Sequence, residues 1–390
     1  MRSLRHVTSI NDLTNPEVEH VFALASQYLK RLGDKDIPYR IAKSTKAGQG
    51  RLLATLFYEP STRTRLSFES AMLRLGGKTI SSADPNASSA AKGESLADSV
   101  RMLSNYADAI VVRHKRDGAA RLAAEYAHVP IINGGDGAHE HPTQTLGDLF
   151  TLRRENATLK NLNVAVAGDL KHGRTIHSLV YALARFGSRI VLMPAPGMGL
   201  PEHVRWRLRH EFPGTVVSEA DQDKPIDVLY VTRFQAERAA NEVSTYPRID
   251  LKFLDDKKFS RARVMHPLPR VNELHIDVDR DARATYFQQA AYAVPVRMAL
   301  LSTVLGLSEK KFAHYAGGFR KVKEELVELP AGHGIACANP NCIVHDEIDG
   351  KYSANKFYAL PSEPPRLRCF YCETDIADVR GAARTRGAAS

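Results

Sequence analysis

The sequence predicts an α/β protein with two doubly wound parallel-sheet halves, followed by a small C-terminal module. Short apolar runs alternate with segments of helical period up to about residue 305, which is typical of βαβ units. All four cysteines lie instead in the last 54 of the 390 residues, which indicates a separate module. A chain of this length has room for two domains of ordinary size and an appendage.

The first half begins with the apolar run LLATLF, which predicts a buried strand. A Ser/Ala/Asn/Pro-rich stretch at 81–91 is typical of a surface loop, and Pro142 is suited to the first turn of a helix. The predicted elements are, in order, a strand at 52–57, a helix at 61–75, a helix from about Glu94, strands at 108–113 and 129–132, and a helix at 142–155.

The second half repeats this alternation, starting from the strand NVAVAG. Its predicted elements are a strand at 163–168, a helix at 173–187, strands at 189–193, 227–232 and 262–267, and a helix from about Gln288 to Leu305. The predicted domains are therefore 1–141, 142–290, a helix at 291–307 that packs back on the first domain, a polar linker at 308–332, a cysteine module at 333–380 and a disordered tail at 381–390.

Composition excludes several classes of protein. With 43% hydrophobic and 25% charged residues the chain is neither disordered nor fibrous, and no apolar run is long enough to cross a membrane. The N-terminus lacks the apolar core of a signal peptide, so we expect a cytoplasmic protein. The net charge of +10 comes without a Lys/Arg run or an aromatic-interleaved basic segment, which favours a solvated surface or a small anionic ligand over nucleic acid.

The segment after the first strand predicts an anion site. Ser61 and Thr62 are suited to begin a helix, whose free N–H groups and dipole favour a negative charge. Arg63 and Arg65 add planar guanidinium groups that can hold phosphate oxygens in pairs. The stretch from Gly168 to Thr175 nearly matches a nucleotide P-loop, but an arginine stands where that motif requires lysine, so we do not expect a nucleoside triphosphate there.

The cysteines form two ligand pairs with the spacing C-x4-C and C-x2-C, separated by 26 residues. Four thiolates around one ion is the closed tetrahedral arrangement of structural zinc, which leaves no open position for catalysis. Two disulfides are the alternative, and they are rare in a cytosolic chain. His345 lies close enough in sequence to replace one ligand. The predicted zinc ligands are Cys337, Cys342, Cys369 and Cys372.

Several motifs together resemble the aspartate carbamoyltransferases, and the resemblance runs from about residue 5 to 308 in order and at family spacing. The related ornithine enzymes share the S-T-R-T-R element but typically carry H-C-L-P, whereas this chain has H-P-L-P. The motifs are Ser61-Thr62-Arg63-Thr64-Arg65, His141-Pro142-Thr143-Gln144, Asp169-Leu170-Lys171-His172-Gly173-Arg174-Thr175 and His266-Pro267-Leu268-Pro269-Arg270.

The resemblance implies transfer of a carbamoyl group from carbamoyl phosphate to the α-amine of L-aspartate, without a catalytic cofactor. Arg63, Thr64, Arg113 and His141 are implied as catalytic residues. The first half would then be the carbamoyl-phosphate domain and the second the aspartate domain. The implied carbamoyl-phosphate contacts are Ser61, Thr62, Arg63, Thr64, Arg113, His141, Gln144, Leu268 and Pro269, and the implied aspartate contacts are Lys92, Arg174, Arg233 and Gln235.

In this family, a loop corresponding to 81–92 reaches into the neighbouring subunit's site. Ser88 and Lys92 match the residues that it supplies, so the resemblance implies a homotrimer with shared sites. His172, Ala91 and Ala236 depart from the residues that relatives often carry, which leaves affinity and pH dependence open.

The cysteine segment resembles the zinc domain of the aspartate carbamoyltransferase regulatory chain. Only about 30 residues separate it from the last helix, so the regulatory chain's nucleotide-binding domain has no counterpart there. We therefore expect no control by nucleotides. Hexamers or larger assemblies through the zinc module, a dihydroorotase partner, a different amine acceptor and a non-catalytic scaffold all stay open, although the set of arginines with His141 argues against a scaffold.

Overall fold

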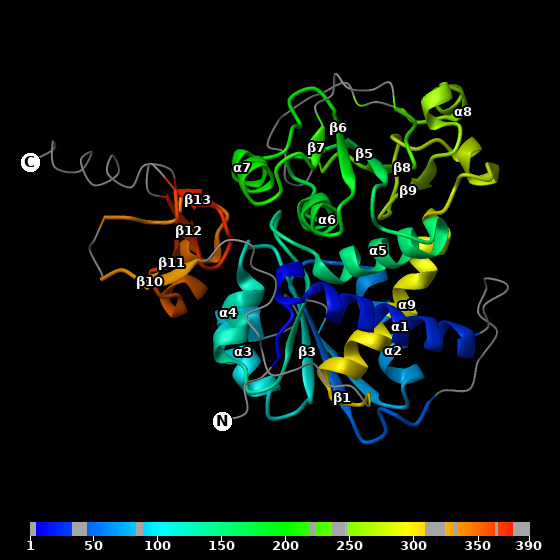
Figure 1. The fold of residues 1–390 in the computed structure, drawn as a ribbon. Helices are drawn as coiled ribbons and strands as arrows, with labels where there is room; N and C mark the ends of the chain where they lie inside the picture. Colours follow the sequence, from blue (N-terminus) through cyan, green and yellow to red (C-terminus); the bar gives the residue numbers. More distant parts are fainter. Residues whose placement is uncertain are drawn as a thin grey trace, which may run out of the picture. The chain divides into compact units, whose positions relative to one another are not determined.

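The computed structural model describes residues 5–32, 45–82, 89–217, 224–235, 246, 248–308, 324–330, 334–362 and 366–376. They fall into two units, each with its own parallel sheet (Figure 1). As far as these ranges are described, unit 1 comprises Met1–Thr14, Thr45–Glu140 and Leu301–Ser390, and unit 2 comprises Asn15–Ser44 and His141–Leu300.

The parallel sheet of unit 1 has the order β2-β1-β3-β4. Phe57 at the end of β1 is paired with Arg113 near the end of β3, so the segments that follow these strands leave the sheet at the same edge. The elements of this part are β1 (Leu52–Phe57), α2 (Thr62–Arg74), β2 (Lys78–Ser82), η3 (Ser89–Lys92), α3 (Leu96–Leu103), β3 (Ala109–His114), α4 (Ala119–Tyr126) and β4 (Ile131–Asp136).

Unit 2 is built on a five-stranded parallel sheet in the order β7-β6-β5-β8-β9, and the central strands β5 and β8 are lined up through Gly168 and Thr232. Val164, Leu229 and Val264 are among its fully buried core residues. The helices are α1 (Asn15–Leu32), α5 (Pro142–Asn156), α6 (Arg174–Arg185), α7 (Glu202–Glu211), α8 (Leu251–Leu254) and α9 (Tyr286–Val304), and the strands are β5 (Asn163–Gly168), β6 (Arg189–Pro194), β7 (Val216–Val217), β8 (Val228–Thr232) and β9 (Arg263–Met265).

The cysteine module belongs to unit 1 and forms an antiparallel sheet in the order β10-β11-β12-β13. The core of the module is continuous with that of the parallel sheet of unit 1, because Ile343, Phe357 and Tyr371 join the same buried cluster as Leu122 and Val112. The strands are β10 (Glu325–Glu328), β11 (Lys356–Leu360), β12 (Arg366–Cys369) and β13 (Asp375–Ile376). The range expected as a linker thus includes β10, which pairs with β11.

The predicted fold class is confirmed, and every element predicted from apolar runs and helical period is present within a few residues of its expected bounds. Helices α1, α4, α7 and α8, strands β2 and β7, and the sheet of the module were not predicted. The missed strands are short or polar, so they lack a distinct apolar run. Among the described residues, no helix combines the length and apolarity that a membrane span requires.

Candidate active site and metal centre

The start of α2 has the properties of an anion site. Ser61 occupies the N-cap position in extended conformation, and its side chain makes no capping hydrogen bond. Thr62 opens the helix, Arg63 is exposed and Thr64 is buried against the unit. The hydroxyl groups and the N–H groups of this first turn are therefore arranged to receive a negatively charged group.

Arg113 stands beside this helix start, because its strand is paired with β1 and its carbonyl accepts the Tyr58 N–H at 2.8 Å. The Arg113 side chain is only 8% exposed. Its guanidinium donates to the Gly134 carbonyl at 3.1 Å and forms an ion pair with Glu59 at 3.1 Å. These contacts hold a cation in one direction at the strand end, so little rotamer freedom is lost when it binds an anion.

Lys92, the predicted loop lysine, ends η3 with an exposed side chain. Ala91 lies beside it in the same short turn and is also exposed. Ser88 and Ala236 lie outside the described residues, as do the predicted tail and most of the predicted linker.

In unit 2, His141 and Gln144 lie at the start of α5. His141 is the N-cap residue, Pro142 follows at the first helical position, and the His141 N–H donates to Ser178 Oγ at 2.9 Å. The His141 imidazole is buried, with Nδ1 3.4 Å from Thr143 Oγ1. Gln144 is partly exposed and its Nε2 donates to Asp148 Oδ1 at 2.8 Å. Both side chains are thus positioned by one helix turn.

The segment from His266 to Pro269 is held by the ring of His266. The Leu268 N–H donates to Nδ1 of this ring at 2.8 Å, and Nε2 donates to Glu273 at 2.8 Å. Burial lowers the pKa of His266, so the ring is neutral at neutral pH. Leu268 has a positive φ of 50° and precedes a cis peptide bond to Pro269. The partly exposed backbone of this turn is therefore fixed from inside.

Three of the four predicted aspartate contacts, all except Lys92, follow β5 and β8, whose ends share an edge of the sheet. Arg174 is the buried first residue of α6. Arg233 follows β8, and one of its Nη atoms donates to the Phe234 carbonyl at 2.9 Å. The Gln235 N–H donates to Asp169 at 3.1 Å and its Nε2 to the Arg233 carbonyl at 3.2 Å. The structure thus brings both arginines and Gln235 to the same edge of unit 2.

Asp169 ties these two segments together. One of its oxygens accepts the N–H groups of Lys171 and His172 at 3.1 and 2.9 Å, and the other lies 3.2 Å from His172 Nδ1. Burial raises the pKa of Asp169, but the hydrogen bonds from His172 and Gln235 outweigh it and hold the pKa below its usual value. Asp169 therefore stays ionised, and His172, which departs from the family pattern, serves as its partner.

The four cysteines form a compact cluster of buried thiols, all free of disulfides. Their sulfur atoms all lie within 4.8 Å of one another, with Cys337 3.4 Å from Cys372 and Cys342 3.9 Å from Cys369. Four sulfurs 2.3 Å from one ion would be about 3.8 Å apart. The donor set and its spacing therefore fit a tetrahedral metal ion, and the separations are too long for disulfide bonds.

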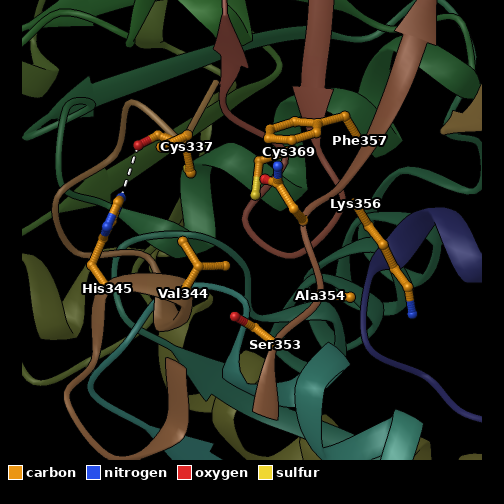
Figure 2. Close-up of a pocket in the computed structure, with 10 residues that line it drawn as sticks. Cys337, Val344, His345, Ser353, Ala354, Lys356, Phe357 and Cys369 are labelled. Carbon is orange, nitrogen blue, oxygen red and sulfur yellow. Dashed lines mark hydrogen bonds between the residues drawn. The ribbon is translucent and has the colours of Figure 1, made fainter. Parts of the chain in front are cut away.

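His345 is not one of the clustered ligands. Its Nε2 donates to the carbonyl of Cys337 at 2.8 Å, so it supports a ligand instead of replacing one (Figure 2). Beside the cluster lies an open hollow of about 200 Å³, lined among others by Cys337, Cys369, Ser353 and Lys356. Two of the four cysteines therefore border this hollow, although both are buried.

The module is joined to the rest of unit 1 by polar contacts around Asp117. Its backbone exchanges hydrogen bonds with Asn341 and Ile343 at 3.1 and 2.9 Å, and its carboxylate accepts the side-chain amides of Asn339 and Asn341. The adjacent Gly118 has φ of 84°, and a Cβ there would lie 2.6 Å from the backbone of Tyr371. Only glycine permits this close approach.

A second set of contacts is a buried ionic network. Arg121 pairs with Glu373, the residue after Cys372, and also donates to the Phe370 carbonyl. A ring nitrogen of His139 and one carboxylate oxygen each of Glu140 and Glu373 lie within 4.8 Å of one another. Burial lowers the pKa of His139, but Asp136 at 3.1 Å and the two glutamates outweigh this and raise it to about 10. His139 and Arg121 together balance these buried carboxylates.

Comparisons with known proteins agree with this geometry. Residues 5–154 match the family model described as aspartate/ornithine carbamoyltransferase, carbamoyl-P binding domain, and residues 160–304 match its Asp/Orn binding domain. Residues 331–380 match the metal binding domain of the aspartate carbamoyltransferase regulatory chain. The fold and the site together define an α/β protein with parallel sheets, in which arginines such as Arg113 and Arg233 lie where strands end.

The chain belongs to the aspartate/ornithine carbamoyltransferase family, as the resemblance of its motifs implied. It is 46% identical over 314 residues to the aspartate carbamoyltransferase catalytic subunit of Methanothrix thermoacetophila, covering 78% of this chain and 99% of that protein. The structure of the catalytic subunit of M. jannaschii aspartate transcarbamoylase is similar, with a TM-score of 0.69 at 43% identity, covering 79% of this chain and 100% of that one.

A further similar structure is that of the Trypanosoma cruzi aspartate transcarbamoylase in complex with carbamoyl phosphate, at 34% identity and a TM-score of 0.68. It covers 77% of this chain and 96% of that one. Sequence reasoning did not single out Glu59 and Asp148, which hold the predicted site residues Arg113 and Gln144, or Glu273, which holds the motif residue His266. Glu59, two residues before Ser61, had a positional signal, whereas the other two become visible only through their contacts.

Proposed function

We propose that this chain transfers the carbamoyl group of carbamoyl phosphate to the α-amine of L-aspartate, giving N-carbamoyl-L-aspartate and phosphate for pyrimidine biosynthesis. The single observation that supports it best is Arg113, buried at the end of β3 beside the start of α2. Family membership and the relatives named above support the same reaction. The four free thiols suit a reducing compartment, so we place the enzyme in the cytoplasm.

The reaction needs no covalent intermediate with the protein. The uncharged amine attacks the carbonyl carbon and the carbonyl oxygen gains negative charge. The C–O bond to phosphate then breaks with its electron pair, and the attacking nitrogen gives its proton to the departing phosphate. Arg113, His141 and Thr64 would stabilise the oxygen, since donors aimed at a developing oxyanion lower the barrier. Arg63 with Ser61 and Thr62 would hold the phosphate.

The remaining groups orient the two substrates. Gln144 and the carbonyls of Leu268 and Pro269 would accept hydrogen bonds from the carbamoyl amide. The two carboxylates of aspartate would pair with arginines, for which bidentate geometry is favourable. The proposed aspartate contacts are Lys92, Arg174, Arg233 and Gln235.

The direct test is a product assay with carbamoyl phosphate and L-aspartate, with L-ornithine and other amino acids as alternative acceptors. We expect N-carbamoyl-L-aspartate from the wild type and at least a 100-fold lower rate from Arg113→Ala, with Arg51→Ala as the control at an exposed arginine outside the site. Formation of citrulline from ornithine, or no product with any amine, would overturn the assignment.

We propose zinc as the ion of the cysteine cluster, since four cysteines at this spacing suit its tetrahedral preference. Its role would be structural. Residues 1–141, 142–290, 291–307, 308–332 and 333–380 remain the proposed domains, connector and module. We expect ATP and CTP to leave aspartate saturation unchanged, and a clear shift of the saturation curve by either nucleotide would contradict this.

The proposed active unit is a homotrimer with shared sites. In unit 1, Leu66 and Leu73 on α2 are about half exposed, and Ile80 on β2 is also exposed, which is consistent with a face covered by another subunit. Mixed reassembly of inactive Lys92→Ala and inactive Arg63→Ala chains should restore part of the activity. If it restores none, Lys92 does not act in the neighbouring site.

A further inference from the structure

A fully buried carboxylate lies one helical turn after Gln144 and receives three hydrogen bonds. Asp148 Oδ1 accepts from Gln144 Nε2 at 2.8 Å and from Gln289 Nε2 at 2.6 Å. Its Oδ2 accepts from the hydroxyl of Tyr230 at 2.8 Å. All four side chains belong to unit 2, and Asp148 has no exposed surface. This carboxylate is therefore the centre of an ordered network.

The network determines which end of the Gln144 amide is available to a ligand. A glutamine amide has a donor NH₂ group and an acceptor oxygen that are nearly equal in size. With Nε2 directed at Asp148, the opposite atom is the acceptor Oε1. Among the residues that the structure describes, none donates to Oε1, and Gln144 is partly exposed. Gln144 thus presents a hydrogen-bond acceptor.

The reversed amide would be strongly unfavourable. It would place Oε1 against Asp148 Oδ1, so that two acceptors without a proton would meet in a site closed to water. Burial raises the pKa of Asp148 to about 6, and the three hydrogen bonds, with the charge of Arg297, limit that rise. At neutral pH the group is mainly ionised, which strengthens its preference for the NH₂ end of Gln144.

A second glutamine, Gln289, connects Asp148 to the turn from His266 to Pro269. Gln289 Nε2 donates to Asp148, and Gln289 Oε1 accepts the backbone N–H of His266 at 2.9 Å. His266 in turn accepts the Leu268 N–H. The orientation of Gln144 and the backbone before Leu268 and Pro269 are therefore set by one buried group.

We infer that Asp148 is a positioning residue that directs the acceptor oxygen of Gln144 toward the transferred group. This orientation favours a carbamoyl donor, which carries an NH₂ group, over an acyl donor that has a methyl group in the same place. The inference rests on the proposed function. Loss of Asp148 should therefore weaken binding of the NH₂ group of carbamoyl phosphate without weakening binding of its phosphate or its carbonyl group.

The test compares carbamoyl phosphate with acetyl phosphate, which has methyl in place of NH₂. For each variant, kcat/KM for carbamoyl phosphate and the competitive inhibition constant of acetyl phosphate are measured at saturating aspartate. Asp148→Ala should lower kcat/KM about tenfold, the value of roughly one hydrogen bond, and change the inhibition constant less than twofold. Equal weakening of both ligands, or no change in either, would overturn the inference.

Controls separate positioning from damage to the fold. Asp148→Leu fills the same space without an acceptor and replaces the alanine variant if the cavity prevents folding. Asp148→Asn keeps an acceptor oxygen and should restore most of the discrimination. Tyr230→Phe removes the bond to Oδ2 and the contacts of the same hydroxyl with Thr175 and Gln289, but it leaves the bond between Asp148 and Gln144 and should leave the ratio of the two constants unchanged. A change in that ratio as large as in Asp148→Ala would count against a special role for the bond to Gln144.

A double variant gives the sharpest outcome. Gln144→Leu should lose as much discrimination as Asp148→Leu, and Gln144→Leu with Asp148→Leu should lose no more, because both remove the same interaction. Additive losses would contradict the inference. Failure of the proposed function looks different, because the wild type itself would then form no N-carbamoyl-L-aspartate.

Discussion

His141 and Arg113 would face the developing charge of the proposed reaction, and both are buried. The guanidinium of Arg113 is held by Glu59 and the Gly134 carbonyl, and the backbone N–H of His141, the N-cap residue of α5, donates to Ser178. His266 shows the same principle, since Glu273 and the Leu268 N–H together define which ring nitrogen carries hydrogen. Side chains such as Arg113 in unit 1 and His266 in unit 2 thus have a fixed orientation before a substrate binds, which electrostatic stabilisation requires.

The first prediction concerns His141. Replacement by alanine should lower kcat about 100- to 1,000-fold, because one donor to the developing oxyanion is lost. Steady-state assays of N-carbamoyl-L-aspartate formation measure this, with the melting temperature as the check on folding. A loss smaller than tenfold in a folded variant would mean that His141 does not contact the oxyanion.

The second prediction uses the raised pKa of Asp148. Its folded pKa of about 6 exceeds the ordinary value of 3.8, so the fold favours the protonated form. The stability from this group is therefore complete below about pH 3.8 and is lost as the pH rises through 6. Between pH 4 and 7 the wild type should lose up to about 3 kcal/mol relative to Asp148→Asn. Urea unfolding of both proteins across this range measures it, and parallel pH curves would contradict it.

At the scale of elements, the cysteine module packs directly on the parallel sheet of unit 1 and its helices, through both apolar and polar contacts. Ile343, Phe357 and Tyr371 fill a core shared with α3, α4, β1 and β3. Along the same seam, the Leu96 N–H donates to Asp349 at 2.7 Å and the Tyr352 hydroxyl to Asp98 at 2.9 Å. The four-cysteine cluster is therefore attached to the elements that carry Arg113.

The third prediction tests the ionic part of this seam. Arg121→Met should destabilise the protein by about 3–5 kcal/mol, because the carboxylate of Glu373 is left buried without its cation. The double variant Arg121→Met with Glu373→Met should recover much of the loss, since no unpaired charge remains. Denaturant unfolding measures both variants. Similar stability of the single and double variants would show that the loss comes from packing alone.

At the scale of the whole molecule, the cysteine cluster is the place where an ion can act on the fold. Its four sulfurs come from two distant segments, so the ion would close the module and complete the core that it shares with the rest of unit 1. Because this module and the two transferase domains belong to one chain, each chain carries its own four-cysteine cluster.

The fourth prediction is the effect of metal removal. The purified chain should contain one zinc ion per chain, and a chelator should lower the melting temperature and release four titratable thiols. The native mass, measured before and after chelation, shows the role in assembly. A particle of three 43.2 kDa chains in both conditions places the module within one trimer, whereas a larger, metal-dependent particle makes it a joint between trimers. An unchanged melting temperature after complete zinc loss would contradict a structural role.

Much of the fold was predictable because its signals are local. Apolar runs such as 52–57 and 163–168 identify buried strands, and Pro142 marks a helix start. The polar strands β2 and β10 were not predictable in this way, because they have little apolar surface to bury. The roles assigned to the candidate site residues came from motif resemblance and stay predictions, although the structure shows which neighbours hold them.

The fold class, the family, the anion-binding pattern of the S-T-R-T-R segment and the four-thiol donor set could all be inferred from the sequence, since each depends on residue type and spacing along the chain. The three-dimensional fold was needed to show that Asp148 accepts from Gln144 and Gln289, which are 145 residues apart, and that Glu373 pairs with Arg121. Buried polar groups must find partners wherever folding places them, and that pairing is a property of three-dimensional packing with no local signature.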